Sequence, residues 1–243
     1  MTVHDIAKTE RIEMYLKAVY SLSHSASPVT IAKVADYMGV SSPSSYEMLK
    51  RLEAQGLLRS GTEQGYRLAP LGLQTAERVV RRLRLAERLL TDVLHLELPA
   101  VYAEACKMEH VISPQVEARL ADVLGHPVTC PHGFPIPGEG PAPPASGTTL
   151  DRLDVWGSAA VASIPEEDQA IVAHLVAVGL TPGAEVQVRE VAPLDGPITL
   201  MVRGQMRALS CDIARRVHVH PLERPDGRPA AHVAPAAQSH RSR

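Results

Sequence analysis

Three side chains that can bind a metal ion lie close together in the segment "EACKMEH", residues 104–110. Cys106, Glu109 and His110 stand at positions i, i+3 and i+4, so in a helix they share one face. A thiolate, a carboxylate and an imidazole suit a borderline divalent transition metal better than Ca²⁺ or Mg²⁺. The spacing fits a solvated Glu–His pair beside a half-buried cysteine equally well, because such patterns are common by chance.

A second candidate is the string "CPHG", residues 130–133, which offers Cys130 and His132. Two ligands are too few for a structural zinc site, and a turn rich in Pro and Gly accounts for the string better. The sequence therefore predicts a turn here rather than a metal site. It contains no Gly-rich phosphate loop, nucleophile elbow or HExxH stretch, so the residues do not indicate an enzyme.

The elements that position the first candidate site are two predicted helices, residues 9–23 and 99–112. In the first, the apolar residues Ile12, Tyr15, Leu16, Val19 and Leu22 gather on one side. Met14 falls nearly opposite Ile12 and lies off this core stripe. In the second helix, the core stripe formed by Val101, Ala105, Met108 and Ile112 is separate from the face that carries the candidate ligands.

Residues 30–68 predict a winged helix-turn-helix. A helix over about 30–38 ends at Gly39, and a second helix begins near Ser42, with Pro43 in its first turn and its end near Gly56. Two short strands around a Gly-containing hairpin follow in "LLRSGTEQGYRLAP". This order of elements is typical of DNA-binding domains.

The start of the second helix would enter the major groove of DNA. The candidate DNA contacts are Ser41, Ser42, Pro43, Ser44, Ser45, Tyr46, Lys50 and Arg51. Residues 1–70 carry eight Lys and Arg against seven Asp and Glu, which is a weak positive balance for a DNA-binding domain. A winged helix that contacts protein, or that serves stability alone, therefore stays open as an alternative.

The remaining chain predicts a mainly α fold followed by a small β-barrel. A long helix over 71–95 and a helix from Pro114 to about Gly125 precede a stretch rich in Pro and Gly. The predicted domains are a winged helix-turn-helix at 1–73, a helical metal-binding and dimerisation domain at 74–140, a linker at 141–153, an SH3-like domain at 154–222 and a disordered tail at 223–243.

The composition gives no sign of a strongly basic protein, a disulfide-rich secreted protein or a membrane protein. The net charge of −2 gives no general attraction to nucleic acid, and three widely separated cysteines do not form a disulfide framework. The sequence contains no apolar run of the length of a signal peptide or membrane span. We therefore expect a cytoplasmic protein that does not bind a membrane.

Four segments, "TERIEMYLKAVYSL", "RLRLAERLLTDVL", "EACKMEHVIS" and "CPHGFPIPG", resemble in this order the diphtheria toxin repressor family of iron- and manganese-dependent regulators. The segments "GLTPGAEV", "GPITLMV" and "LSCDIARRVHV" resemble the SH3-like domain of that family and of ferrous-iron transport A proteins. The resemblance implies a homodimer that binds double-stranded operator DNA when loaded with divalent metal. It also implies a repressor of metal uptake genes rather than an enzyme.

The resemblance implies two metal sites. The primary site maps onto Met14, Cys106, Glu109 and His110, and the ancillary site maps onto Glu87, Glu166 and Gln169. Two ancillary positions that are histidine in the family hold Leu83 and Tyr102 here. The ancillary site is therefore either remodelled, for example through Glu104, or absent.

The ligand types favour Fe²⁺, because Met and Cys are softer than the Asp and Glu of the manganese-specialised relatives, but Mn²⁺ stays open. We expect Co²⁺, Ni²⁺, Zn²⁺ or Cd²⁺ to substitute in vitro. The competing interpretation is a metal-independent winged-helix regulator that responds to a protein or a small molecule.

Overall fold

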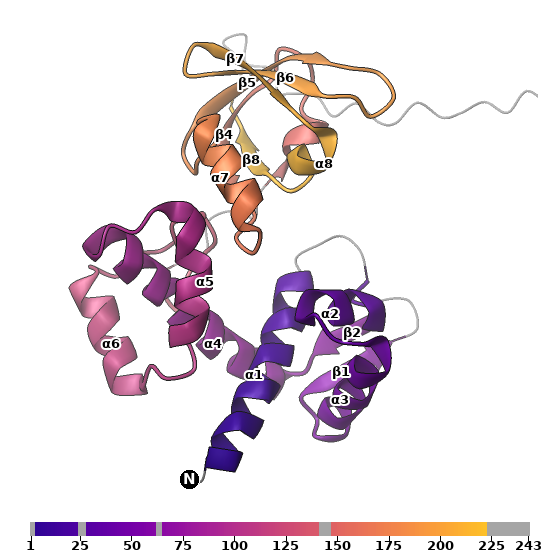
Figure 1. Cartoon of the computed structure of the whole chain (residues 1–243), viewed down its shortest axis with the longest axis vertical. Coiled ribbons are helices and arrows are strands. Elements are labelled where there is room, and N and C mark those ends of the chain that lie inside the picture. Colours follow the sequence, from indigo (N-terminus) through magenta and orange to yellow (C-terminus); the bar gives the residue numbers. More distant parts are fainter. Residues whose placement is uncertain (1–2, 24–27, 62–64, 141–146, 223–243) are drawn as a thin grey trace, which may run out of the picture. The chain divides into compact units, whose positions relative to one another are not determined.

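The computed structural model describes residues 3–23, 28–61, 65–140 and 147–222 of the 243-residue chain (Figure 1). The chain divides into two units, Met1–Ala86 with Ala105–Gly125, and Glu87–Glu104 with His126–Arg243. The tail predicted to be disordered, residues 223–243, and residues 141–146 of the predicted linker lie outside the described residues.

The first unit begins with a winged helix-turn-helix, as predicted from the sequence. It comprises α1 (Val3–Ser23), α2 (Ile31–Met38), α3 (Ser42–Ala54), β1 (Leu58–Gly61) and β2 (Gly65–Leu68), and β1 pairs antiparallel with β2. Tyr15, Leu16 and Val19 of α1 share one buried core with Leu49 and Leu52 of α3. The orientation of α3 is therefore tied to α1 by packing (Figure 1).

Local signals in the sequence explain the tight turn between α2 and α3. Gly39 ends α2 in the left-handed conformation, with φ of 63°, which glycine adopts without strain. The Ser41 hydroxyl then accepts a hydrogen bond from the backbone N–H of Ser44, and Pro43 lies in the first turn of α3. The helix predicted from this segment is confirmed, and it begins at Ser42.

Two helices of the middle segment end differently from the prediction. The helix predicted over 71–95 is observed as α4 (Pro70–Arg88) followed by a π-helical turn, η1 (Leu89–Val93). The helix predicted over 99–112 is α5 (Leu98–Met108), and Glu109 still donates its backbone N–H to the carbonyl of Ala105. The Ser113 side chain caps α6 (Pro114–Val123).

The second unit carries the β-rich domain expected from the C-terminal sequence. Its antiparallel sheet has the order β3-β8-β4-β5-β6-β7. The strands are β3 (Thr148–Thr149), β4 (Ser158–Ser163), β5 (Glu185–Val191), β6 (Ile198–Val202), β7 (Gln205–Leu209) and β8 (His218–Pro221). Register shifts in β4 and β5 mark bulges, which favour the curvature visible in Figure 1.

The core of this sheet follows the alternation read from the sequence. Val186 and Val188 of β5 and Leu200 of β6 are buried against Val172 and Leu175 of α7 (Gln169–Ala177). The short helices η2 (Leu150–Arg152) and α8 (Cys211–Ala214) complete the unit.

Among the described residues, no helix combines the length and the apolar composition that crossing a bilayer requires. The cysteines Cys106, Cys130 and Cys211 form no disulfide.

Candidate metal centres

The predicted primary centre lies in the first unit, where α1 meets the end of α5. Cys106 belongs to the last turn of α5, and Glu109 and His110 follow directly after it. Glu109 is buried, and its Oε1 lies 3.3 Å from Nε2 of His110. The structure therefore brings the carboxylate and the imidazole together, as the spacing predicts.

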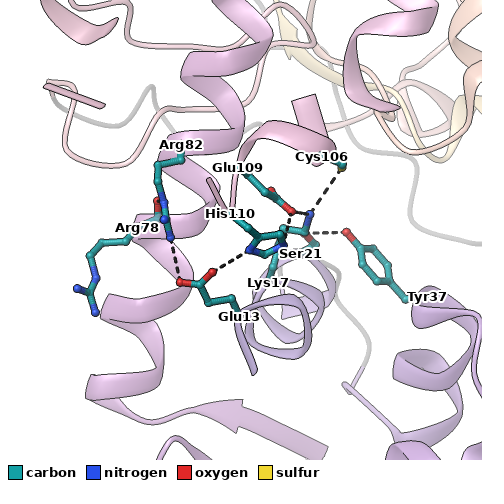
Figure 2. A network of polar contacts seen from close by, with 9 residues as sticks. All are labelled: Glu13, Lys17, Ser21, Tyr37, Arg78, Arg82, Cys106, Glu109 and His110. Carbon is teal, nitrogen blue, oxygen red and sulfur yellow. Dashed lines mark hydrogen bonds and ion pairs between the residues drawn. The ribbon is translucent and has the colours of Figure 1, made fainter. Parts of the chain in front are cut away.

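A lysine that the sequence prediction did not include enters this cluster from α1. Figure 2 shows the Lys17 ammonium between Cys106 and Glu109. It forms an ion pair with Oε1 of Glu109, and its Nζ lies 3.7 Å from Sγ of Cys106. Burial lowers the pKa of Lys17, but the charges of Glu109 and Cys106 outweigh this effect and raise it overall, so the amine is charged.

The second ring nitrogen of His110 faces a carboxylate. Nδ1 of His110 lies 2.8 Å from Oε2 of Glu13, and the other oxygen of Glu13 is 3.0 Å from the Arg82 guanidinium (Figure 2). Contacts with Glu109 and Glu13 raise the pKa of His110 to about 9. Burial raises the pKa of Glu13, but His110 and Arg82 outweigh burial, and the net direction is downward. Such a carboxylate–histidine contact fixes the ring orientation and directs the other nitrogen to a metal.

Met14 is adjacent to Glu13 and three residues before Lys17, so it lies near the cluster along α1. Its side chain is nevertheless 41% exposed, unlike the buried Glu109. The structure thus places Met14 on the helix predicted to supply a ligand, without burying its side chain in the cluster.

The second cluster lies entirely in the second unit. Glu87 comes from the end of α4, Cys130 and His132 from the "CPHG" turn, and Glu166 from the segment between β4 and α7. One ligand atom of each residue lies within 4.8 Å of the others, and all four residues are buried. In the described part of the chain, this is the one group of His, Cys, Asp and Glu that is arranged so closely.

Two residues of this second cluster, Glu87 and His132, have buried side-chain atoms without a hydrogen bond among the described residues. Neither oxygen of Glu87 and neither ring nitrogen of His132 has a hydrogen-bond partner among the described residues. Nδ1 of His132 lies 3.2 Å from Oε1 of Glu87, and Sγ of Cys130 lies 4.0 Å from Oε2 of Glu166. Burial lowers the pKa of His132, but Glu87 and other nearby acids outweigh it and raise the pKa.

Buried polar atoms without partners are rare in folded proteins, and a bound metal ion would satisfy these. A thiolate, an imidazole and two carboxylates form a donor set that suits Fe²⁺, Mn²⁺, Zn²⁺ and their neighbours. The residues of this cluster therefore fit a divalent transition metal.

Backbone contacts position the two ligands of the turn. The N–H of Cys130 donates to the carbonyl of Phe134, and the N–H of Ile164 donates to the carbonyl of His132. Gly133 has a φ of 93°, and a Cβ at this position would lie 2.0 Å from the carbonyl oxygen of Ala162. Only glycine allows the turn to approach β4 this closely.

Three family models match consecutive parts of the chain. They are described as "Iron dependent repressor, N-terminal DNA binding domain" at residues 8–66, "Iron dependent repressor, metal binding and dimerisation domain" at residues 69–138, and "FeoA domain" at residues 148–221. The chain belongs to the iron-dependent repressor family.

Similar proteins support this membership over most of the length. The iron-dependent repressor IdeR of Mycobacterium tuberculosis is 37% identical over 205 residues, which cover 79% of this chain and 88% of IdeR. The diphtheria toxin repressor of Corynebacterium diphtheriae is 31% identical over 232 residues, which cover 86% of this chain and 96% of that protein.

Solved structures of repressors have the same fold. A manganese-dependent transcriptional repressor in complex with manganese superposes with a TM-score of 0.81 at 28% identity, covering 87% of this chain and all of that chain. ScaR with bound Zn²⁺ superposes with a TM-score of 0.76 at 30% identity, covering 87% of this chain and 99% of that one.

Within this family fold, the second cluster adds a candidate metal site to the turn that we predicted for "CPHG". The turn is present, as expected, but the side chains of Cys130 and His132 join Glu87 and Glu166. The "CPHG" string alone offers only two candidate ligands, because Glu87 and Glu166 lie far away along the chain. Gln169, which the resemblance also implied, is exposed at the start of α7, and Glu104 is not part of the cluster.

The candidate DNA contacts on α3 divide by exposure. Most of them are exposed or half-buried, but Ser45 is fully buried in the core of the winged helix. Its position on α3 faces inward together with Met48 and Leu49, so the side chain of Ser45 cannot reach DNA without unfolding the helix. The structure thus removes Ser45 from the set.

Proposed function

We propose that this chain is a divalent-metal-dependent transcriptional regulator that binds operator DNA as a homodimer in the cytoplasm and represses metal uptake genes. Membership of the iron-dependent repressor family supports this proposal. The observation that carries it is the cluster of Cys106, Glu109 and His110 against α1, because α1 shares its core with the DNA-binding helix α3.

The primary centre in this proposal consists of Met14, Cys106, Glu109 and His110. When bound, Fe²⁺ or Mn²⁺ would supply coordination bonds that link α1 to the end of α5. Glu13 orients the imidazole of His110 through Nδ1 and leaves Nε2 for the centre. Fixing α1 restricts the orientations of α3 and shifts the population toward the form that binds DNA.

The second centre in this proposal consists of Glu87, Cys130, His132 and Glu166. Support comes from the burial of the four residues, from the atoms of Glu87 and His132 that make no hydrogen bond among the described residues, and from the donor types. In this proposal, Cys130 and His132 take the place of the two histidines expected from the resemblance, beside Glu87 and Glu166, so the ancillary site is remodelled rather than absent. Because all four ligands lie in the second unit but are far apart in the sequence, the centre would stabilise that unit.

We include the exposed and half-buried candidates at the N-cap and along α3 as DNA contacts in this proposal: Ser41, Ser42, Pro43, Ser44, Tyr46, Lys50 and Arg51. The start of α3 presents its hydroxyl groups to solvent, which suits contacts to phosphates and base edges. Lys50 forms an exposed ion pair with Glu53 at 2.8 Å, and binding to a phosphate would replace this weak pair.

The test is a DNA-binding titration with an operator selected from a random DNA pool in the presence of Mn²⁺. Cys106→Ala and His110→Ala should abolish the dependence of DNA affinity on Fe²⁺ and Mn²⁺ while the far-UV circular dichroism stays unchanged. Cys211→Ala, at the half-buried cysteine of α8, is the matched control and should behave like the parent chain.

Unchanged metal dependence in both variants would reject the primary centre. Binding of the selected DNA by the parent chain with equal affinity in chelator and in metal would favour the competing function, a metal-independent regulator.

A further inference from the structure

Lys17 has an unusual environment for a lysine. Its side chain is buried, whereas lysines are almost never buried without a partner. The partner is Oε1 of Glu109, and the next neighbour is Sγ of Cys106 (Figure 2). Both are proposed metal ligands, so the ammonium occupies the space between two donor atoms that a metal ion would have to contact.

The charges around Lys17 make joint occupancy unfavourable. Arg82 already adds positive charge on the other side of the cluster, where its guanidinium pairs with Glu13. A divalent ion beside a buried ammonium would be repelled strongly, because the interior screens charges less than water does. The long aliphatic chain of lysine allows its ammonium to swing toward solvent while the stem stays packed.

The carboxylate of Glu109 also points to an exchange of cations. Its Oε1 pairs with Lys17, whereas its Oε2 is buried without a hydrogen-bond partner among the described residues. The ammonium therefore provides a partner for only one of the two oxygens of this buried carboxylate. A metal ion bound by this carboxylate would need Lys17 to leave.

We propose that Lys17 is an internal cation that holds the primary centre together without metal and that the incoming divalent ion displaces it from Glu109 and Cys106. This proposal rests on the proposed primary centre. Lys17 is thus a positioning residue that keeps Glu109 paired in the metal-free protein and reduces the metal affinity. The strength of its ion pair helps to set the metal concentration at which the regulator responds.

The first experiment measures Co²⁺ affinity by chelator competition, followed through the Co²⁺–thiolate absorption. All proteins in this experiment carry Cys130→Ser, which removes the thiolate of the second centre. The Co²⁺–thiolate absorption then reports on Cys106 in the primary centre. Lys17→Gln should tighten Co²⁺ binding by about tenfold or more, because the metal no longer has to break a buried ion pair. Lys107→Gln, which neutralises an exposed lysine next to Cys106, is the control and should bind like the parent.

Equal or weaker Co²⁺ binding by Lys17→Gln would overturn the displacement proposal. Glu109→Gln separates this failure from failure of the centre itself. If Glu109→Gln binds Co²⁺ as tightly as the parent, the primary centre is wrong. If Glu109→Gln loses Co²⁺ binding while Lys17→Gln is unchanged, the centre stands and only the role of Lys17 falls.

A second measurement follows Lys17 directly in the parent chain, so the protein that is tested carries no substitution at this buried position. The chain contains five lysines, so their side-chain NH₃⁺ signals in a ¹⁵N-lysine-labelled protein form a simple spectrum. The signal absent from the Lys17→Gln spectrum identifies Lys17. Addition of Zn²⁺ to the full chain should move this signal to the position and fast exchange of the solvated lysines. A Lys17 signal that Zn²⁺ leaves unchanged would contradict displacement.

Discussion

At the scale of single residues, His110 links metal binding at the proposed primary centre to pH. Glu109 and Glu13 hold its pKa at about 9, above the ordinary value of 6.5. The imidazolium is therefore the stable form in the metal-free protein at neutral pH. A metal ligand must be the neutral imidazole, so binding at this centre releases a proton.

The raised pKa predicts how the stability of the metal-free chain depends on pH. Its contribution is fully present below pH 6.5, and it is lost as the pH rises through about 9. We expect the free energy of unfolding, measured by urea titration in chelator, to fall by on the order of 2 kcal/mol over this window. Apparent metal affinity should rise over the same window.

His110→Gln provides the reference for this prediction, because it keeps hydrogen-bonding capacity but does not titrate. Its pH profile should lack this component of the decrease, although the raised pKa of His132 contributes to both profiles in the same direction. Identical profiles for the parent and the variant would show that His110 is not held in its charged form.

At the scale of structural elements, the "CPHG" turn depends on one glycine. Gly133→Ala should destabilise the second unit, because the new Cβ would collide with the carbonyl oxygen of Ala162 in β4. Gly204 is the matched control, since its φ of 77° is also positive but nothing lies within 4 Å of a Cβ there. Alanine at a positive φ costs about 1 kcal/mol in both variants. The difference between their free energies of unfolding therefore measures the collision with Ala162.

Urea unfolding followed by circular dichroism checks this prediction. Gly133→Ala should unfold at a clearly lower urea concentration than Gly204→Ala, and the loss should include metal binding at the second cluster. Equal midpoints would mean that the turn adjusts away from β4 at little cost.

The elements were predictable where the signal is local. The N-cap at Ser41, the left-handed Gly39 and the apolar stripe of α1 are signals within a few residues, and the winged helix follows from them. The end of α5 at Met108 was not predictable from periodicity, because the helical hydrogen bonding continues past it through Glu109.

The candidate sites depend on contacts between distant segments, which limits what the sequence shows. Glu109 and His110 lie within one turn and were identified from their spacing. Cys130 and His132 needed Glu87 and Glu166, which reach them only through folding of the second unit. Lys17 had a signal that was overlooked: it lies one helical turn after Met14, on the helix predicted to supply a ligand.

At the scale of the whole molecule, two separate clusters predict two metal ions per chain. Elemental analysis after equilibrium dialysis with Mn²⁺ or Co²⁺ should give a stoichiometry of two for the parent. His132→Gln should reduce it to one, because it removes an imidazole ligand of the second centre, and Cys106→Ala should also leave one. The expectation of two fails if the parent binds a single ion or if both variants bind as much as the parent.

The cysteines give the two centres different chemical durability. Cys130 is 1% exposed, whereas Cys106 is half-buried. Oxidants attack accessible thiolates first, and a sulfinic or sulfonic acid is no longer a thiolate ligand. We therefore expect peroxide to disable the proposed primary centre before the buried one, so that exposure to air removes the metal response of DNA binding while the second centre still binds its ion.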